Sequence, residues 1–511
     1  MRLDRNTRLA IALSSITFLI HSYAVFFAGF SWFRDELYYM ASTDHLAFGY
    51  VDHPPLSIWL LWLVKTVFGE SLVVVRLVPA IVSSVVVFLA SKTAQRLGGG
   101  TISVVLTALS VTFMPVFMGM NSVYSMNTFE YFFWTLSIYM AISLQDDPSP
   151  RKFIWLGVVM GIALLNKISA GWLIAGFFVS LILSHNRTWF TTRWPWLTGG
   201  ITLIIFSPFV IWNIANDLPH LEFMRNAVEL KYGNITRLDF LTGQIMMISP
   251  LPLLVAISGL WYLFFNNEGR KQQTPGIVFV TTGLILLANS HSKPEYLGAA
   301  YPALLAAGGV FLEKQVILSK WAAYPVKYLL PSAIVLTGLF AMPIVVPVLN
   351  VDDTIKYLQD SGFSPPSNEG HRLTHLPQHY ADMHGWEELA RSVKEVYESI
   401  PGKDTLSILI VANNYGEASA INVLGKKYGL PYCTTEHNSY WMWGTPKEKY
   451  DCYISIGDSE EDVRGYAVDP VLKGVHTARY AMPYENNLNI WVAYRLKYPL
   501  PELWAKAKKY I

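Results

Sequence analysis

Long runs of residues without a charged side chain constrain this sequence more than any other feature. The first run extends from residue 9 to residue 33 and contains no Asp, Glu, Lys or Arg. A helix of about 20 apolar residues is long enough to cross the hydrocarbon core of a bilayer. Candidate ranges in this chain are 9–30, 72–91, 101–120, 124–144, 153–167, 170–185, 196–214, 241–265, 276–291, 297–313 and 326–349. The chain is therefore predicted to be a polytopic α-helical membrane protein with about 11 transmembrane helices.

Composition divides the chain into two parts. Of its 511 residues, 52% are hydrophobic and 15% are charged, whereas a soluble domain carries roughly a quarter charged residues. The deficit lies in residues 1–350, which we predict to be the transmembrane domain, with loops 31–71 and 215–240 at the outer face. Residues 351–511 have an ordinary soluble composition and are predicted to form a C-terminal soluble α/β domain. The net charge of +2 argues against a nucleic-acid partner.

Basic residues predict the orientation, because cytoplasmic loops carry an excess of Lys and Arg. Arg2, Arg5 and Arg8 precede the first apolar range, which we interpret as a retained anchor rather than a cleaved signal peptide. With the N-terminus in the cytoplasm, each inner loop is basic: Lys92, Arg96, Arg151, Lys152, Arg187, Arg193, Arg270, Lys271, Lys314 and Lys320. The predicted location is the plasma (inner) membrane, with the C-terminal domain extracytoplasmic.

Local patterns predict several elements outside the membrane. In the first outer loop we expect a helix over 34–41 and an apolar helix over 56–68 that lies in the outer interface, with Lys65 snorkelling. In the C-terminal domain we expect helices at 386–399 and 415–428, and strands at 406–412, 450–456 and 487–496. Cys433 and Cys452 both fall in this domain, where a disulfide and two buried free thiols are both open.

Ionisable residues in or against apolar helices indicate function, because they are costly to place there. By the predicted orientation, eight such residues lie at outer helix ends: Asp35, Glu36, Asp52, His53, Glu130, Lys167, Lys293 and Glu295. We expect them to converge on one outward-facing cavity. Asp35 could act as a general base toward an acceptor hydroxyl. Lys293, Lys167 or a metal could hold a phosphate leaving group.

Four of these residues also have a structural interpretation. Asp35 could be a helix cap, and Asp52 could be a turn residue before two prolines. Glu130 could be a pairing group within the helix bundle, and Lys167 could reach the interface on its own.

Asp52 and His53 are chemically suited to ligate a divalent cation, but two ligands are too few to name the metal.

Several motifs resemble one family of membrane enzymes. The turn Asp35-Glu36-Leu37-Tyr38-Tyr39 resembles the Asp-Glu motif of the GT-C membrane glycosyltransferases. The most similar groups are the dolichyl-phosphate-mannose protein mannosyltransferases and the bacterial aminoarabinose transferases, of the glycosyltransferase family 39 type. His53-Pro54-Pro55-Leu56 resembles their second loop motif. Further similar segments are Tyr124-Ser125-Met126-Asn127, Lys293-Pro294-Glu295-Tyr296, Ala381-Asp382-Met383-His384 and Asn414-Tyr415-Gly416-Glu417.

The resemblance implies an inverting glycosyltransferase, either a hexosyl- or a pentosyltransferase. Such an enzyme moves a sugar from a polyprenyl-phosphate carrier to an acceptor lipid, glycan or protein at the outer membrane face. Its partners would be the polyprenyl-phosphate donor, membrane lipids and an unknown acceptor. Carried over to this chain, Asp35 is the catalytic base with Glu36 beside it. The substrate-binding candidates are His53, Lys167, Lys293, Tyr296 and Glu130, and the metal candidates are Asp52 and His220. A divalent metal ion is the one cofactor that these residues suggest.

Two other classes of function remain open at this point. A secondary transporter also has many spans and a few intramembrane charges, but it usually carries them near mid-span on interrupted helices in repeated halves. A non-catalytic membrane protein could instead bind the polyprenyl lipid as a scaffold. Loss of the carboxylates at residues 35 and 36 would leave a scaffold intact and would abolish transfer by an enzyme.

Overall fold

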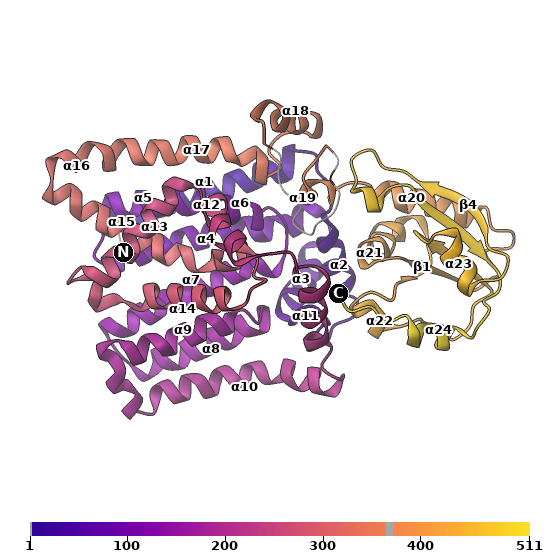
Figure 1. The fold of residues 1–511 in the computed structure, drawn as a ribbon, viewed down its shortest axis with the longest axis horizontal. Coiled ribbons are helices and arrows are strands. Elements are labelled where there is room, and N and C mark those ends of the chain that lie inside the picture. The colour runs from indigo at the N-terminus through magenta and orange to yellow at the C-terminus, as the bar shows by residue number, and fades with distance from the viewer. Residues whose placement is uncertain (1–2, 364–372, 374) are drawn as a thin grey trace. The chain divides into compact units, whose positions relative to one another are not determined.

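The computed structural model describes residues 3–363, 373 and 375–511, which fold into two compact units (Figure 1). Each unit gathers separate stretches of the sequence. The first contains residues up to 29, 73–212 and 232–350, and the second contains residues 30–72, 213–231 and 351–511. The second unit thus joins most of both predicted outer loops to the C-terminal residues.

The first unit consists of helices. Proline occupies the first turn of α8, α13 and α14, where its missing amide costs no hydrogen bond. The α-helices are α1 (Arg5–Phe27), α4 (Leu72–Arg96), α5 (Thr101–Thr112), α6 (Pro115–Met120), α7 (Met126–Asp146), α8 (Pro150–Asn166), α9 (Ala170–Leu183), α10 (Trp194–Ala215), α12 (Arg237–Ile248), α13 (Pro250–Phe265), α14 (Thr274–Ala288), α15 (Tyr301–Leu318), α16 (Lys320–Tyr324) and α17 (Leu330–Val345). Short 3-10 segments are η1 (His185–Thr191), η2 (Gly269–Gln272) and η3 (Pro294–Ala300), and η4 (Pro325–Leu329) is a π-helix.

Helix α15 lies at the centre of this unit. All its residues from Tyr301 to Val310 are buried. Gly308 of α15 packs against the backbone of Val255 in α13, and Gly259 of α13 packs against the backbone of Leu304, so that a Cβ at either glycine would overlap a carbonyl oxygen. Small residues let membrane helices approach closely and gain dispersion energy. The glycines therefore fix the α13–α15 packing.

Within the described residues, five helical stretches are long and apolar enough to cross a membrane, or six if one bent pair counts as a span. They are Arg5–Phe27, Leu72–Arg96, Trp194–Ala215, Pro294–Leu318 and Lys320–Val345. The other predicted ranges are helical too, in α5 to α9 and α14, but these helices do not combine that length with that apolarity. The count of eleven therefore stays a prediction.

Two predicted ranges are broken rather than continuous. The range 241–265 is divided between α12 and α13, which are bent by 108°. Ser249 has a φ of 71° at the break, and Pro250 follows it and starts α13. The range 101–120 is divided between α5 and α6 in the same way, since Pro115 begins the second helix. A proline cannot supply the amide that a continuing helix requires.

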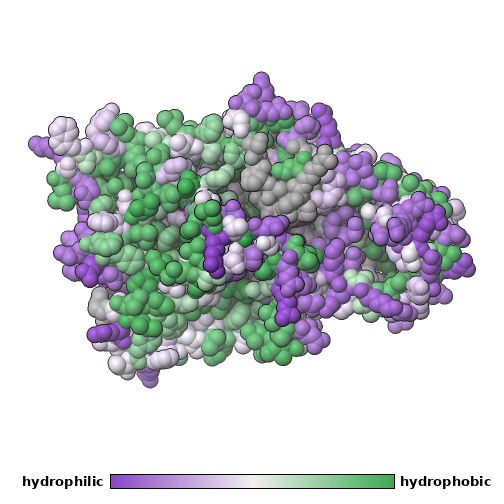
Figure 2. All heavy atoms as spheres, viewed as in Figure 1, coloured by the Kyte–Doolittle hydropathy of each residue, from purple (hydrophilic) through white to green (hydrophobic). Residues whose placement is uncertain are grey.

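The surface of the helical unit is apolar over wide areas, as the green residues in Figure 2 show. Large side chains that are mostly exposed include Leu203, Ile204, Ile211, Leu284 and Leu336. Contiguous apolar surface of this kind is expected where lipid, rather than water, surrounds the helices.

The second unit combines two helices of the predicted first outer loop with a sheet domain. The helices are α2 (Arg34–Ser42), α3 (Leu56–Phe68), α11 (Pro219–Leu230), α18 (Val351–Ser361), α19 (Gln378–Ala381), α20 (Trp386–Glu398), α21 (Tyr415–Leu424), α22 (Ser439–Trp443), α23 (Glu460–Tyr466) and α24 (Leu500–Lys506), with 3-10 turns η5 (Gly425–Tyr428) and η6 (Pro483–Glu485). Helices α2 and α3 coincide with the two predicted in the loop. The Nζ of Lys65, which is predicted to snorkel, lies 2.9 Å from Asp44 and 3.4 Å from Glu70.

A mixed sheet of five strands forms the core of the second unit in the described part of the chain. Its strands are β1 (Ile408–Ala412), β2 (Cys433–Thr434), β3 (Cys452–Ile456), β4 (Val471–His476) and β5 (Leu488–Ala493), in the order β2-β1-β3-β5-β4. Strand β1 is parallel to β2 and β3, whereas β5 is antiparallel to β3 and β4. The predicted strands correspond to β1, β3 and β5, and the predicted helices to α20 and to α21 with η5. The predicted strands did not include β2, which has only two residues, or β4, a mostly exposed edge strand without an apolar pattern.

Both cysteines are buried free thiols. Cys433 lies on β2 and Cys452 lies on β3, the two strands that flank β1. Two strand spacings of about 4.8 Å each separate the two cysteines. Their Cα atoms are therefore farther apart than the roughly 7 Å that a disulfide allows. Of the two possibilities that the sequence left open, the structure has the free thiols.

The close approach of α13 and α15 leads to a stability prediction. Replacing Gly308 by alanine should destabilise the protein by roughly 1–3 kcal/mol, because the new methyl group must push the Val255 carbonyl away. Thermal unfolding of the purified protein in detergent measures the change. Gly200→Ala in α10 is the control, since open space surrounds that position. Equal melting temperatures for both variants would contradict this account of the packing.

Candidate active site

Asp35 is an accessible carboxylate at the start of α2. It is the second residue of the helix, where the free backbone amides favour a negative charge. Its side chain is 41% exposed. The hydroxyl of Tyr415 donates a 2.9 Å hydrogen bond to Asp35 Oδ1, and Arg34 Nε lies 3.8 Å from the same oxygen. One side of the carboxylate is thus held in place while the group stays open to a substrate.

Glu36 has a different environment from its neighbour. It is fully buried, and its Oε2 accepts a 3.0 Å hydrogen bond from the backbone amide of Phe33, the residue that precedes α2. This contact satisfies an amide that the helix itself cannot pair. In the structure Glu36 therefore positions the turn that carries Asp35 and does not present its carboxylate to solvent.

Arg34 anchors this turn to the C-terminal residues of the same unit. Its Nη1 donates a 2.6 Å hydrogen bond to the Tyr484 oxygen, and its Nη2 lies 4.0 Å from Asp382 Oδ2. The guanidinium also lies 5.4 Å from the centre of the Tyr415 ring. Burial works against the charge, but Asp382 and the two tyrosines outweigh it and raise the pKa of Arg34 well above its ordinary value. No local pattern in the sequence predicts these contacts, although Asp382 and Tyr415 lie in the segments that resemble the family.

Two buried carboxyl groups stand next to this anchor. Asn414 Nδ2 donates to Glu417 Oε1 at 2.9 Å and to Glu485 Oε1 at 3.1 Å, and the Asn413 amide donates to Glu417 Oε2 at 3.0 Å. Burial raises the pKa of Glu417, and the nearby Glu485 raises it further. Burial likewise raises the pKa of Glu485 to about 7. At least one carboxyl group of the pair is therefore expected to hold a proton near neutral pH.

Asp52 lies at the end of the turn that precedes α3. Tyr38 of α2 donates a 2.9 Å hydrogen bond from its hydroxyl to Asp52 Oδ1. His53 Nε2 lies 4.0 Å from the same oxygen, and His53 Nδ1 lies 2.9 Å from the Pro54 carbonyl. The His53 ring packs between Tyr39 and Tyr50, with 4.9 Å between ring centres on either side. Because His53 is only 1% exposed, the structure shows it supporting Asp52 rather than facing solvent.

His220 enters the same region from α11. Its Nδ1 lies 2.9 Å from the Val51 carbonyl, directly before Asp52. Burial lowers the pKa of His220, so the ring is neutral at physiological pH. A hydrogen bond from one ring nitrogen to a carbonyl is the kind that orients a histidine metal ligand. The described residues contain no group of three or more His, Cys, Asp or Glu side chains placed to hold a metal ion, so Asp52 and His220 would need water or substrate oxygens to complete a site.

A second polar cluster is buried in the first unit. Lys167, at the end of α8, lies 2.6 Å from Glu130 Oε2 and 2.7 Å from Asn127 Oδ1, both on α7. Ser169 donates a short hydrogen bond to the other oxygen of Glu130. Glu130 therefore pairs with Lys167 inside the helix bundle, as its structural interpretation predicts. The Lys167 ammonium also lies 5.6 Å from the centre of the Tyr296 ring.

Lys293 lies in the loop before η3. Its Nζ is 4.4 Å from the centre of the Tyr232 ring and 3.9 Å from Glu295 Oε1, and its side chain is 14% exposed. Gln244 of α12 donates a 3.0 Å hydrogen bond to the Pro294 carbonyl, which fixes this loop against α12. A predominantly apolar cavity of about 320 Å³ opens between α12, α13, α14 and α15, and its lining includes Gln244 and Leu297. The short segment from Lys293 to Leu297 therefore carries the ammonium group at one end and lines the apolar cavity at the other.

The predicted site residues thus fall into two sets. Asp35, Glu36, Asp52, His53 and His220 come together in the second unit. Glu130, Lys167, Lys293 and Tyr296 belong to the first unit. Their convergence on a single cavity stays a prediction.

Comparisons with known proteins agree with some of the motifs. A sequence profile of the family described as dolichyl-phosphate-mannose-protein mannosyltransferase matches residues 52–212. The lipid A galacturonosyltransferase RgtD of Rhizobium johnstonii is 21% identical over 295 residues, which is 57% of this chain. The match spans 61% of the length of that relative.

Two solved structures share the fold. The crystal structure of ArnT from Cupriavidus metallidurans bound to undecaprenyl phosphate has a TM-score of 0.59 and 13% identity, over 95% of this chain and 97% of that chain. The same protein in the apo state has a TM-score of 0.60 and 12% identity, over 96% and 98% of the two chains. The chain therefore shares the fold of these proteins, and its long apolar helices indicate an integral membrane protein. Its predicted resemblance to the family 39 type of GT-C glycosyltransferases is confirmed.

The buried carboxyl pair predicts how stability depends on pH. The pKa of Glu485 rises from its ordinary value of 4.5 to about 7 on folding, so the folded protein binds a proton more tightly than the unfolded chain. The second unit should therefore lose stability as the pH rises from about 4.5 to about 7. Glu485→Gln should weaken this dependence and stabilise the unit above pH 7.

Hydrogen exchange of the β1 and β3 amides, followed by mass spectrometry across this pH range, reports on the second unit directly. Glu461→Gln, at an exposed position of α23, is the matched control and should leave the wild-type pH dependence in place. The same slope in the Glu485 variant and in the wild type would contradict the assignment.

Proposed function

We propose that this protein is an inverting glycosyltransferase that moves a sugar from a polyprenyl-phosphate carrier to an acceptor at the outer membrane face. The observation that carries the proposal is the environment of Asp35. It is an exposed carboxylate, held by Tyr415 at a helix start, whose acidic neighbour Glu36 is buried in a capping contact. A general base needs this combination of access and fixed orientation.

The proposed reaction forms one bond and breaks another. An acceptor hydroxyl attacks the anomeric carbon of the donor sugar, and its proton passes to the Asp35 carboxylate. The bond between the anomeric carbon and the phosphate oxygen breaks, and the polyprenyl phosphate leaves with the electron pair. Attack from the face opposite the phosphate inverts the anomeric carbon.

The first unit offers the features that the donor requires. Lys293 and Lys167 are ammonium groups suited to a phosphate, and Tyr296 lies against Lys167. Such cations stabilise the charge that develops on a leaving phosphate. The apolar cavity beside α12 is chemically suited to part of an isoprenoid chain. The ArnT structure with undecaprenyl phosphate supports this class of donor by its fold.

The remaining parts of the proposal concern topology and metal. We place the N-terminus in the cytoplasm and residues 351–511 outside it, in the plasma (inner) membrane, because of the distribution of Lys and Arg. Residues 1–350 would supply the transmembrane part with its outer loops. We also propose Asp52 and His220 as ligands of a divalent cation, which would neutralise phosphate charge when bound.

Replacing Asp35 by asparagine tests the base. Transfer from a panel of polyprenyl-phosphate sugars should fall about 10²- to 10⁴-fold, because the amide cannot accept the proton. The melting temperature should be nearly unchanged, since the amide oxygen still accepts from Tyr415. Asp404→Asn is a control at a carboxylate that is 84% exposed, and it should retain full activity.

The wild type and both variants are compared with each donor for transfer and for donor hydrolysis. Full activity of the Asp35 variant would remove this residue from the mechanism. Binding of polyprenyl lipid without transfer in any combination would favour a scaffold, and uptake of a solute into vesicles would favour a transporter.

A second variant tests the phosphate site. Lys293→Gln should raise the KM for the donor about tenfold, which corresponds to ~1.4 kcal/mol of lost binding, and should change kcat less. Steady-state kinetics at varied donor concentration separate the two parameters. Lys271→Gln removes an exposed lysine of η2 and serves as the control. Unchanged KM in the Lys293 variant would exclude this lysine from donor binding.

A further inference from the structure

A second cavity lies within the second unit, apart from the Asp35 carboxylate. Its volume is about 550 Å³, within the range of roughly 300–1,000 Å³ that is usual for small-molecule sites. The lining comes from three segments: the end of α2 and the residues after it, α21 with η5, and residues 430–446. The role proposed above for Asp35 makes no use of this cavity.

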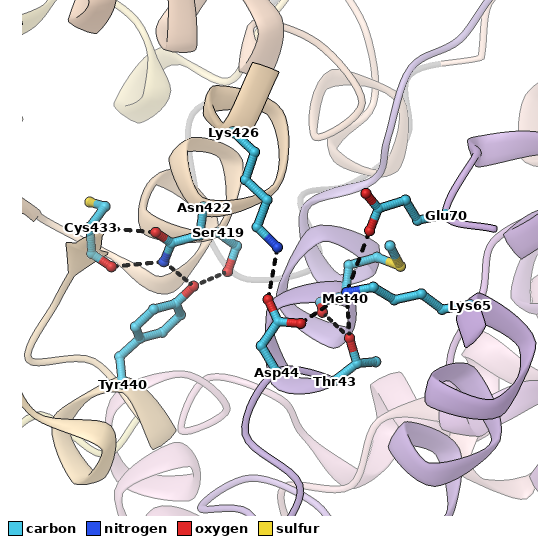
Figure 3. A network of polar contacts seen from close by, with 10 residues as sticks. All are labelled: Met40, Thr43, Asp44, Lys65, Glu70, Ser419, Asn422, Lys426, Cys433 and Tyr440. Carbon is cyan, nitrogen blue, oxygen red and sulfur yellow. Dashed lines mark hydrogen bonds and ion pairs between the residues drawn. The ribbon is translucent and has the colours of Figure 1, made fainter. Parts of the chain in front are cut away.

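Aromatic rings form much of its wall. The His45 imidazole stacks on the Trp443 indole, with 4.3 Å between ring centres and 8° between planes. Tyr440 meets Trp443 edge-on at 4.5 Å, and Tyr432 lies 6.3 Å from His45. Tyr440 is locked, because its hydroxyl lies 3.0 Å from Ser419 and accepts a hydrogen bond from Asn422, as Figure 3 shows. The Tyr440 ring is therefore held in place before any ligand binds, which lowers the entropy cost of binding.

Charged groups of both signs stand beside these rings. Lys426 extends toward Asp44 and donates a 2.9 Å hydrogen bond to its Oδ2, while Lys65 donates to Oδ1 at 2.9 Å (Figure 3). Glu70 lies 3.4 Å from Lys65, so two cations face two carboxylates. Asp44 is 46% exposed and Lys426 is 52% exposed, and an ion pair this open contributes only about 0–1 kcal/mol. Ligand hydroxyls could replace one of these bonds at little cost, and the balanced charge gives no preference for an anion.

This combination matches the chemistry of a sugar. A pyranose ring has faces of C–H groups that pack against the electron-rich faces of aromatic rings, and a rim of hydroxyls that both donate and accept hydrogen bonds. We infer that the cavity bounded by Asp44, His45, Lys426, Tyr432 and Trp443 is a binding site for a neutral saccharide.

The position of the cavity suggests which saccharide it would take. Tyr415, at the start of α21, bonds to Asp35 at the start of α2, and Lys426, just beyond α21, bonds to Asp44 just beyond α2. The two helices therefore run side by side, and the cavity lies roughly 14 Å along α2 from Asp35. A saccharide bound there could extend its reacting end toward the carboxylate. Naming this ligand the acceptor rests on the proposed function, whereas the saccharide site itself does not.

The test is direct binding, measured by calorimetry on the full-length protein in detergent without donor. The probes are the neutral trisaccharides maltotriose, mannotriose and cellotriose, and the anionic trigalacturonate. We expect at least one neutral trisaccharide to bind, and Trp443→Ala to raise its Kd at least about tenfold. Lys426→Met, at an exposed position that does not endanger folding, should raise the Kd about threefold. Tyr498→Ala, an exposed aromatic residue of the same unit outside the cavity lining, is the matched control.

The outcomes separate the two hypotheses. Asp35→Asn should bind the trisaccharide as the wild type does, even though transfer is lost. Binding of none of the neutral probes, stronger binding of trigalacturonate, or equal affinity in the wild type and both cavity variants would overturn the saccharide site. Saccharide binding that needs Trp443 in a protein that transfers no sugar would retain the site and reject the proposed function.

Discussion

Burial of the Arg34 guanidinium organises the second unit. A charge taken out of water needs partners with good geometry, and removing one partner of a buried pair typically costs 3–5 kcal/mol. The partners of Arg34 come from three distant positions, Asp382, Tyr415 and Tyr484. One charge therefore ties the start of α2 to segments that the chain places hundreds of residues later. Successive residues of a helix point about 100° apart, so the inward turn of Arg34 leaves Asp35 free to face solvent.

In the first unit, two charged groups of opposite sign pair with each other. There Glu130 and Lys167 neutralise one another between α7 and α8, with Asn127 and Ser169 completing their hydrogen bonds. Such a pair is tolerated among apolar helices because neither group is left uncompensated. A phosphate that approached Lys167 would compete with Glu130 for the same ammonium. The Lys293 ammonium lies 3.9 Å from Glu295 Oε1, farther than the 2.6 Å between Lys167 and Glu130.

The sequence predicted the helical ranges and the residues of the Asp-Glu turn, because apolar periodicity and isolated charges are local signals. It placed α3, α20, β1 and β3 within a few residues for the same reason. It read 241–265 as one helix, although Ser249-Pro250 lies inside that range, because hydropathy does not register a bend. It named Asp35 as the base with Glu36 beside it, but it did not predict that the Asp35 side chain is exposed and that Glu36 is buried. Their difference depends on the amide of Phe33 and the hydroxyl of Tyr415, one nearby and one distant.

The sequence by itself determined that this is a membrane protein with acidic residues directly after an apolar helix, since hydrophobicity and charge are properties of the residues alone. It also carried the family motifs, including the tail segments with Asp382 and Tyr415. Only the tertiary structure decided which carboxylates are open, which are paired and which have raised pKa values. Those outcomes depend on burial and on partners far apart in the chain, and no local pattern encodes a contact between residues 34 and 484.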